Sequence, residues 1–310
     1  MIAHDLHPDY LSTRYAVERA EADAGLTLVG VQHHHAHLAA CLAEHGETGR
    51  ALGVIFDGTG YGEDSSVWGG ELLEGDLRGF DRAGMLMPVR LPGGDRAIKE
   101  PWRMAASWLS HAFDSELPPI PHSLAGDVDA LDWEAVCGIV QTGVSSPVTT
   151  SAGRLFDAVS AICGIRGRVT YEGQAAAELE GIADPREEAA YDFEVEGGQG
   201  APLVLDPRPA IRQVVDDLDG GVAIEAVAVR FHNGLAAAAA AAAERACGER
   251  GLDTVVLSGG VFQNRLLAER TLSRLESAGV QTLVPEALPP NDGGIAFGQV
   301  AVAAARLAEG

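Results

Sequence analysis

Two strongly apolar segments of this 310-residue chain each run directly into a glycine-rich stretch. Residues 51–56 precede Asp-Gly-Thr-Gly-Tyr-Gly at 57–62, and residues 254–257 precede Ser-Gly-Gly at 258–260. Apolar runs of this length predict buried β-strands, and glycine at a strand end lets backbone N–H groups approach a phosphate. Because an alanine-rich helical pattern at 222–250 lies between them, we expect an α/β fold that binds its ligand at the strand ends.

The rest of the chain is expected to complete the sheet and its helices. The stretch 57–62 is expected to be the turn of a hairpin whose second strand covers 66–73. A mostly helical region is predicted from about 101 to 164, and 181–222 is predicted to form surface connections around one short strand at 202–205. Neither glycine stretch matches a P-loop or a Gly-x-Gly-x-x-Gly fingerprint, which disfavours those nucleotide-binding folds.

Four of the ten histidines lie within five residues, at His33, His34, His35 and His37. They follow an apolar run at 26–31 that predicts a strand, and they open a segment that predicts a helix. His33 and His37 are four residues apart, so on a helix they share one face, where two imidazoles can bind one metal ion. These residues alone leave two alternatives open: a helix N-terminus with surface histidines, and a cluster that arose by chance.

Asp57 and Asp292 are the natural carboxylate partners of the two histidines, because both stand beside glycines at expected chain turns. Two histidines with two carboxylates would leave coordination positions open, which a metal that activates a substrate requires. This donor set suits Fe(II) or Zn(II) and does not choose between them. Taken singly, each aspartate is better explained as a turn residue that bonds its own backbone.

The composition narrows the classes of partner. The formal net charge of −23 disfavours unaided binding to nucleic acid or to an anionic membrane. The four cysteines form no Cys-x-x-Cys pair, so a zinc ribbon or a redox pair is not expected. Because neither a signal peptide nor an apolar run of membrane-spanning length is recognisable, we predict a cytoplasmic protein with reduced thiols.

Nine short motifs are spread over residues 2 to about 300: Asp5-Leu-His-Pro-Asp-Tyr, His33-His-His-Ala-His, Phe56-Asp-Gly-Thr-Gly-Tyr-Gly, Gly93-Gly-Asp-Arg-Ala, Glu100-Pro-Trp-Arg, Gly153-Arg-Leu-Phe-Asp, Tyr171-Glu-Gly-Gln-Ala, Leu257-Ser-Gly-Gly-Val-Phe-Gln-Asn and Pro290-Asn-Asp-Gly-Gly. In this order they closely resemble the C-terminal part of HypF, the carbamoyltransferase of nickel–iron hydrogenase maturation. The same domain type occurs in TobZ-like O-carbamoyltransferases and in TsaD, the tRNA threonylcarbamoyl transferase.

The resemblance implies an actin-like ATPase (ASKHA) fold of two subdomains. Residues 1–50 would be the remainder of the first subdomain, with the histidine motif, and 51–310 would be the second, with the nucleotide-binding turns. HypF also has an acylphosphatase-like domain, Cys-rich zinc fingers and a YrdC-like domain, and the first β-hairpin of its actin-like fold has no counterpart in this sequence. We therefore expect these parts to come from upstream sequence or from a neighbouring chain.

The resemblance also implies an activity. In HypF, carbamoyl phosphate and ATP give carbamoyl-adenylate in the YrdC-like domain, and the domain resembled here passes the carbamoyl group to the C-terminal cysteine of HypE. The resulting thiocarbamate later supplies a cyanide ligand to the hydrogenase. Carbamoyl transfer to HypE is the expected function. Two alternatives are a TobZ-like O-carbamoyltransferase of a small molecule and a nucleotide-binding fragment that needs a partner chain for activity.

Carried over motif by motif, the resemblance implies a set of site residues. The metal, Fe(II) or Zn(II), would be bound by His33, His37, Asp57 and Asp292. The nucleotide, ATP or carbamoyl-adenylate with Mg²⁺, would be bound by Thr59, Gly60, Glu172, Gly173, Gly259, Gly260 and Asn264, with Asp157 as an acid near the ribose. The phosphate or carbamoyl group would be contacted by Lys99 and Arg103, and Asp57 would also act in catalysis. His34 and His35 are expected either to support the metal ligands from behind or to pack beside them, and His232 is expected to be a core or surface residue.

Overall fold

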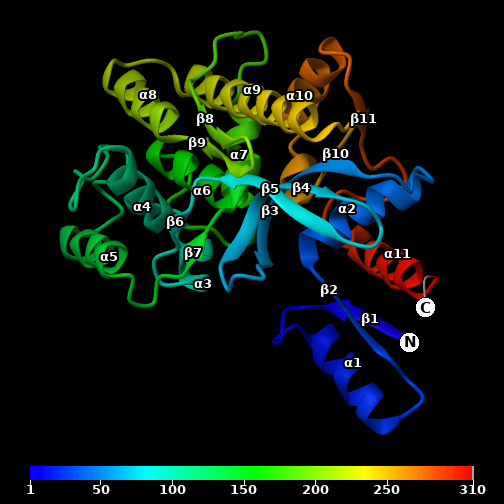
Figure 1. Cartoon of the computed structure of the whole chain (residues 1–310). Coiled ribbons are helices and arrows are strands. Elements are labelled where there is room, and N and C mark those ends of the chain that lie inside the picture. Colours follow the sequence, from blue (N-terminus) through cyan, green and yellow to red (C-terminus); the bar gives the residue numbers. More distant parts are fainter. Residues whose placement is uncertain (309–310) are drawn as a thin grey trace.

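The computed structural model describes residues 1–308. Figure 1 shows a central sheet covered by helices, with a small β–α–β unit set apart at the N-terminus. In chain order the elements are β1 (Ile2–Asp5), α1 (Leu11–Ala22), β2 (Leu28–Val31), α2 (His33–Glu44), β3 (Ala51–Tyr61), β4 (Val67–Gly75), β5 (Phe80–Leu86), β6 (Val89–Arg90), α3 (Asp95–Lys99), α4 (Trp102–Ala112), α5 (Ala130–Thr142), β7 (Val148–Thr149), α6 (Ala152–Ile162), α7 (Gln174–Ile182), β8 (Glu194–Gly198), β9 (Ala201–Asp206), α8 (Arg208–Asp219), α9 (Ile224–Arg250), β10 (Thr254–Ser258), η1 (Gly260–Gln263), α10 (Arg265–Ser277), β11 (Gln281–Leu283), η2 (Asp292–Gly294) and α11 (Ile295–Leu307).

A nine-stranded sheet forms the centre of the described chain, which confirms the predicted α/β class. Its main path runs in the order β11-β10-β3-β4-β5-β9-β8, with β7 paired to β4 and β6 paired to β7. β3 pairs in parallel with β10 and antiparallel with β4. Because β3 and β10 are parallel neighbours, the glycine-rich segments at their C-terminal ends lie side by side at one edge of the sheet.

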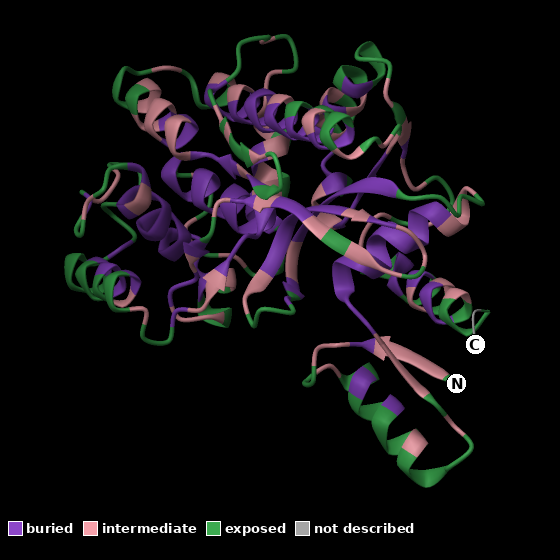
Figure 2. Cartoon of the chain, viewed as in Figure 1, coloured by how far each residue is buried: buried purple, intermediate pink, exposed green. Residues whose placement is uncertain are grey.

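β3 is buried on both faces, which explains why its sequence is an almost continuous apolar run. Leu52, Val54 and Phe56 join the large core formed with residues of α4, α6 and α9. Ala51 and Ile55 point the other way, into a smaller core with residues of α2. Figure 2 shows this buried centre in purple. The strand that precedes the glycine-rich segment is therefore fixed from both sides.

α2 and α11 pack against each other, and one residue permits their close approach. A Cβ atom at Gly298 would lie 1.9 Å from the carbonyl oxygen of Ala36. Only glycine, which has no Cβ atom, allows the two helix backbones to come this close. Because α11 follows η2 without a break, this contact also fixes where η2 lies relative to α2.

β1, α1 and β2 form a small unit that projects from the rest of the chain. β1 and β2 pair in parallel with each other to form a separate two-stranded sheet. α1 buries Thr13 and Ala16, and most of its remaining surface is exposed (Figure 2). The unit contacts α11 and leads directly into α2, so it sets the position at which the histidine helix begins.

The expectation that 57–62 forms the hairpin turn is wrong. β3 continues to Tyr61, and the turn into β4 lies at 62–66. The register between β3 and β4 shifts between Phe56 and Gly60, so the residues between them form a bulge within the strand. Glycine is common at such bulges, and the sequence pattern of a bulge resembles that of a turn.

The expectation for 181–222 is correct for the strand at 202–205, which is part of β9, and wrong for the surface connections around it. This region contains the β8–β9 hairpin at the edge of the sheet and the helix α8. α8 buries Ala210, Ile211 and Val214 on one side, and its residues Asp216 and Asp219 are exposed. Half of the α8 residues are polar or charged, so its composition resembles that of a surface connection, although its apolar residues have helical spacing. None of the helices in the described chain combines the length and apolar character needed to cross a membrane.

Candidate active site

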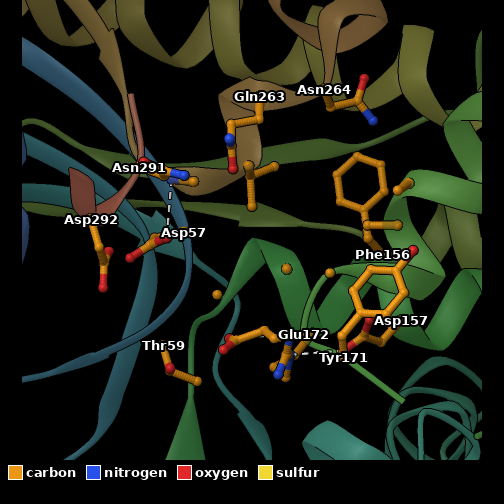
Figure 3. A pocket seen from close by; sticks show the side chains of 18 of the residues that line it. Asp57, Thr59, Phe156, Asp157, Tyr171, Glu172, Gln263, Asn264, Asn291 and Asp292 are labelled. Carbon is orange, nitrogen blue, oxygen red and sulfur yellow. Dashed lines mark hydrogen bonds and ion pairs between the residues drawn. The ribbon is translucent and has the colours of Figure 1, made fainter. Parts of the chain in front are cut away.

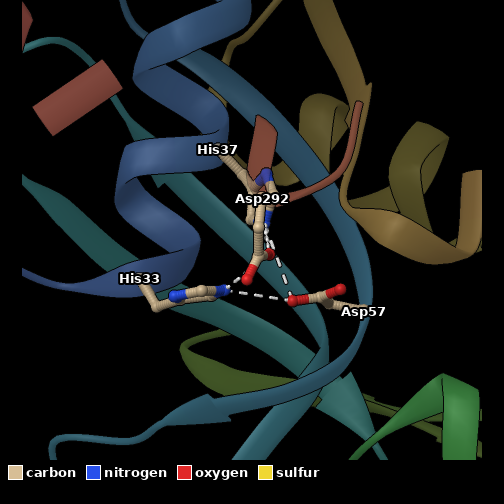
Figure 4. Close-up of side chains that lie close together, drawn as sticks. All are labelled: His33, His37, Asp57 and Asp292. Atoms are coloured by element: carbon tan, nitrogen blue, oxygen red, sulfur yellow. Dashed lines mark hydrogen bonds and ion pairs between the residues drawn. The ribbon is translucent and has the colours of Figure 1, made fainter. Parts of the chain in front are cut away.

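Four side chains from three separate segments converge at one edge of the sheet (Figure 4). His33 and His37 lie one turn apart on α2, Asp57 lies in the bulge of β3, and Asp292 begins η2. One imidazole nitrogen or carboxylate oxygen from each residue lies within 4.8 Å of the others. The structure thus brings together all four residues that were predicted from the sequence as metal ligands. We refer to them as the His–Asp cluster.

The potential ligand atoms of the His–Asp cluster all point at one another. Nε2 of His33 lies 3.2 Å from Oδ2 of Asp57 and 3.4 Å from Oδ1 of Asp292. Nε2 of His37 lies 3.6 and 3.7 Å from the same two oxygens. Nδ1 of His33 donates to Oδ2 of Asp5 at 2.8 Å, and Oδ1 of Asp57 accepts from the N–H of Gly260 at 3.0 Å. Asp5 and Gly260 therefore hold Nε2 of His33 and Oδ2 of Asp57 toward the centre of the cluster.

The electrostatics of the cluster also suit a cation. Burial alone would lower the pKa of His33, but its contacts with Asp292, Asp5 and Asp57 raise that pKa well above 6.5. Burial would raise the pKa of Asp57, but its contacts with His33 and His37 lower that pKa well below the usual value. The carboxylates therefore favour a positive charge at this point. A bound divalent cation would displace the proton that His33 otherwise holds.

One buried atom supports the fit to a metal. Nε2 of His37 is buried and makes no hydrogen bond within the described chain. A buried polar atom without a hydrogen bond is uncommon in native proteins and indicates a ligand or an ion. Two imidazole nitrogens and two carboxylate oxygens are donors that both Zn(II) and Fe(II) accept. The residues present therefore fit either of the predicted metals.

A cavity of about 560 Å³ opens beside the His–Asp cluster (Figure 3). Its wall is formed by the bulge of β3, the first half of α6, α7 with the loop before it, η1 and the start of η2, together with Tyr10. Asp57 and Asp292 belong both to this wall and to the cluster. The volume is within the range of small-ligand pockets. The other predicted site residues in the wall are Thr59, Asp157, Glu172, Gly173, Gly260 and Asn264.

The hydroxyl of Ser151 positions the bulge of β3. Oγ of Ser151 accepts a hydrogen bond from the N–H of Arg154 and so caps the N-terminus of α6. The same Oγ is within hydrogen-bonding distance of the carbonyl oxygens of Asp57 and Gly58. Because the bulge interrupts pairing with β4, these carbonyls need another donor. Ser151 therefore joins the bulge to the helix that forms the next part of the cavity wall.

Asn264 is held in the wall by both ends of its side-chain amide. Its Oδ1 accepts from the N–H of Leu267 and caps α10. Its Nδ2 donates to Nε2 of His232 at 2.8 Å, and Nδ1 of His232 donates to the carbonyl oxygen of Ala228. His232 is buried, which is one of the two positions expected for it, and it also orients Asn264.

Comparison with known proteins decides the family. Residues 53–299 match the family described as "Carbamoyltransferase, Kae1-like Domain, second subdomain", and residues 1–44 match "HypF Kae1-like domain". The chain belongs to the HypF carbamoyltransferase family. The resemblance read from the nine motifs is therefore confirmed.

HypF relatives match almost the whole chain. Carbamoyltransferase HypF of Rhodobacter capsulatus is 42% identical over 99% of this chain and 39% of its own length. A carbamoyltransferase HypF homolog of Cupriavidus necator is 38% identical over 98% of this chain and 77% of its own length. This chain thus spans about two fifths of the R. capsulatus relative and a larger share of the shorter homolog.

Solved HypF structures share the fold. The crystal structure of full-length HypF in the phosphate- and nucleotide-bound form matches with a TM-score of 0.88 at 36% identity, over 99% of this chain and 47% of that chain. The crystal structure of T. kodakarensis HypF matches with a TM-score of 0.87 at 28% identity, over 98% and 40%. These similarities confirm the Kae1-like fold that the motifs implied.

Two residues of the expected HypF site do not line the cavity. Lys99 is exposed at the C-terminal end of α3. Arg103 is buried on α4, where its Nε lies 2.5 Å from Oε2 of Glu100. Glu100 also forms ion pairs with Arg96 and Arg168. In this HypF domain both basic residues therefore lie at the α3–α4 junction, and the structure does not bring them to the nucleotide-sized cavity.

Gly60 and Gly259 lie just behind the cavity wall. A Cβ atom at Gly60 would lie 2.3 Å from Cε1 of His34, so Gly60 lets β3 pass close to the histidine rings. Gly259 has a φ of +101°, and a Cβ atom there would lie 2.3 Å from the carbonyl oxygen of Phe56. This conformation brings η1 against β3. Both glycines shape the HypF site without facing its cavity.

Several other side chains of the HypF site were not singled out from the sequence. Asp5 and Tyr10 belong to the first motif, but only the fold shows that Asp5 bonds His33 and that Tyr10 lines the cavity. Ser151 could have been recognised as an N-cap residue before a helical pattern. The other polar side chains of the cavity wall that the sequence did not assign are Arg154, Tyr171, Glu180, Gln263 and Asn291. The contact of His232 with Asn264 was not predicted either.

The His232 contact predicts a pH dependence of stability. Burial lowers the pKa of His232 from 6.5 to about 4. Between these two pH values His232 binds a proton in the unfolded chain but not in the folded one. The contribution of His232 to the free energy of unfolding is therefore fully present above pH 6.5 and is lost as the pH falls toward 4. Relative to the non-titrating variant His232→Gln, the wild type is expected to lose about 2 kcal/mol of unfolding free energy from pH 7 to pH 5. Urea unfolding of both proteins measures this difference, and parallel pH profiles would contradict it.

Proposed function

We propose that this chain transfers a carbamoyl group from carbamoyl-adenylate to the C-terminal cysteine thiol of HypE, the step before cyanide-ligand synthesis in nickel–iron hydrogenase maturation. The main support is that Asp57 and Asp292 face both the His–Asp cluster and the cavity. A ligand in the cavity would therefore touch a metal in the cluster. Further support comes from the relatives, which are named carbamoyltransferases, and from the HypF structure described as phosphate- and nucleotide-bound.

The residues of the cavity would divide the work of binding the adenylate. Asp157 and Glu172 would accept hydrogen bonds from the ribose hydroxyls, and the second N–H of the Asn264 amide would donate to the ligand. Thr59 and the glycine segments would lie along the phosphate. When bound, the metal would supply Lewis-acid polarisation of the carbamoyl oxygen. His33 and His37, together with the two aspartates, would keep that metal at the cavity wall.

The cysteines of the chain support an acceptor thiol that comes from outside. All four are buried and free. Burial raises the pKa of Cys41 and Cys163 to about 12, and that of Cys137 and Cys247 to about 11. Only the thiolate is an effective nucleophile, so none of these residues suits covalent catalysis at neutral pH. A cysteine of a partner protein, which we propose to be HypE, would then receive the carbamoyl group.

The donor would be made outside this chain. The chain spans about two fifths of the R. capsulatus HypF relative. We propose that acylphosphatase-like, zinc-finger and YrdC-like domains, from upstream sequence or a neighbouring chain, form carbamoyl-adenylate from carbamoyl phosphate and Mg²⁺-bound ATP. The intermediate would then enter the cavity beside the His–Asp cluster.

A reconstituted transfer assay tests the proposal. The chain is loaded with Zn(II) or Fe(II) and mixed with HypE and a YrdC-like domain that makes carbamoyl-adenylate in situ. Mass spectrometry of the HypE C-terminal peptide is expected to show one added carbamoyl group that requires the chain and the metal. HypE without its terminal cysteine is the control. If the chain binds nucleotide but HypE stays unmodified, transfer to HypE is refuted and the nucleotide-binding alternative gains support.

A further inference from the structure

The charges in the cavity wall are strongly unbalanced. Arg154 is the only arginine or lysine among the described residues that line the cavity. Five carboxylates line the same wall: Asp57, Asp157, Glu172, Glu180 and Asp292. An anionic ligand in such a cavity needs positive charge beyond any metal in the His–Asp cluster, because like charges repel strongly where water is excluded. Arg154 is the residue of this wall that can provide it.

Arg154 is buried but incompletely paired. Its side chain is 2% exposed, and its Nε lies 2.8 Å from Oδ2 of Asp157. Its Nη2 is 4.0 Å from Oε1 of Glu172, at the limit of an ion pair. Within the described chain, Nε and Nη1 make no hydrogen bond of good geometry. A guanidinium group has five N–H donors, so this group retains several donors for a further acceptor.

The position of Glu172 indicates where that acceptor would bind. The Glu172 side chain is 59% exposed, and its Oε1 would lie 2.8 Å from a Cβ atom at Gly58. Its carboxylate therefore occupies the space between Arg154 and the bulge of β3. Figure 3 shows Glu172 and Asp157 on the same side of the cavity. An exposed carboxylate held by one long contact can yield its place to a ligand that bonds the guanidinium more closely.

We propose that Arg154 binds the phosphate of the adenylate, and that Glu172 occupies this phosphate position when the cavity holds no ligand. The proposal rests on the proposed function, because it takes an adenine nucleotide as the ligand. Planar guanidinium groups suit phosphate oxygens, which accept two parallel N–H donors. On ligand binding, Glu172 would move from the guanidinium toward the ribose. Asp157 would stay paired with Nε and keep the guanidinium in position.

A purely structural role of Arg154 is the competing explanation. Burial raises the pKa of Asp157 to about 6, and Arg154 counters this by favouring the charged carboxylate. Removal of Arg154 alone would leave Asp157 buried without its partner and would destabilise the fold whatever Arg154 does to the ligand. The test must therefore remove the arginine from a protein in which Asp157 is already neutral.

The experiment compares Asp157→Asn with the double variant Arg154→Met/Asp157→Asn, each as the full 310-residue chain. Calorimetry measures binding of AMP and of adenosine in one metal-containing buffer, and thermal unfolding confirms that both variants fold. The double variant is expected to bind AMP about tenfold to a hundredfold more weakly than the single variant, with adenosine affinity changed less than about threefold. Restoring charge as Arg154→Lys/Asp157→Asn is expected to recover part of the AMP affinity.

The outcomes separate this proposal from the proposed function. If the affinities for AMP and adenosine fall in parallel, or if neither falls, Arg154 does not bind the phosphate. The proposal that the cavity binds a nucleotide is not affected by that result. If the wild-type chain binds neither AMP nor adenosine, the phosphate role of Arg154 and the nucleotide site are both refuted.

Discussion

Replacement of Asp57 by asparagine is expected to remove metal binding and to slow carbamoyl transfer roughly a thousandfold, since Lewis-acid stabilisation is worth several kcal/mol and each 1.4 kcal/mol is a factor of ten. Asparagine keeps the shape, and its Oδ1 can still accept from the N–H of Gly260. The change removes the negative charge that faces His33 and His37. Metal content after dialysis and the HypE transfer assay measure the two effects.

The matched control for Asp57→Asn is Asp132→Asn. Asp132 is exposed on α5, far along the chain from the His–Asp cluster, and the substitution makes the same change of charge. It is expected to leave metal content and transfer unchanged. Normal metal content in Asp57→Asn would show that the cluster is not the metal site, and normal transfer without metal would show that the reaction does not use it.

Gly298→Ala is expected to destabilise the fold by about 3 kcal/mol or more, since overpacking against backbone cannot be relieved by a rotamer change. The new Cβ atom would lie 1.9 Å from the carbonyl oxygen of Ala36, so α11 must move away from α2. For a chain of this size the midpoint of thermal unfolding should fall by roughly 5–10 °C. Because α11 continues directly from η2, Asp292 should move from His37, and metal affinity should fall as well.

Gly248→Ala is the control for this substitution. Gly248 lies within α9, and a Cβ atom there would meet no other atom within 4 Å. Here alanine is expected to stabilise the protein by up to about 1 kcal/mol through its helix propensity. A Gly298→Ala protein as stable as the wild type would show that the two helices can separate without cost.

The parts of the site that were predictable are those encoded by local spacing. His33 and His37 share a helix face because they are four residues apart, and this holds before any tertiary contact is known. The strands that end at the glycine-rich segments are equally local, since each is a continuous apolar run. Asp57 and Asp292 became candidates through their glycine neighbours and the family motifs, and only the parallel pairing of β3 with β10 shows why the first meets Gly260.

The parts that were not predictable depend on which way a side chain faces in the assembled fold. Lys99 and Arg103 follow the Gly-Gly-Asp segment closely in the sequence, yet local pairing with Glu100 holds Arg103 at the α3–α4 junction. Asp5 meets His33 because β1 and β2 pair in one particular register. Arg154 and His232 lie on the largely apolar inner faces of α6 and α9. The sequence around such a buried polar residue does not show which side chain it will contact.

The sequence separation within the His–Asp cluster has a consequence for synthesis of the protein. Two of its residues, at positions 33 and 37, come from α2, and one, at position 292, comes from the 3₁₀-turn η2 before the last helix. During translation the histidines leave the ribosome long before Asp292 exists. With the metal role proposed above, a nascent chain would offer the ion only an incomplete set of ligands. The complete set would form only after nearly the whole described chain has been made and α11 has docked on α2.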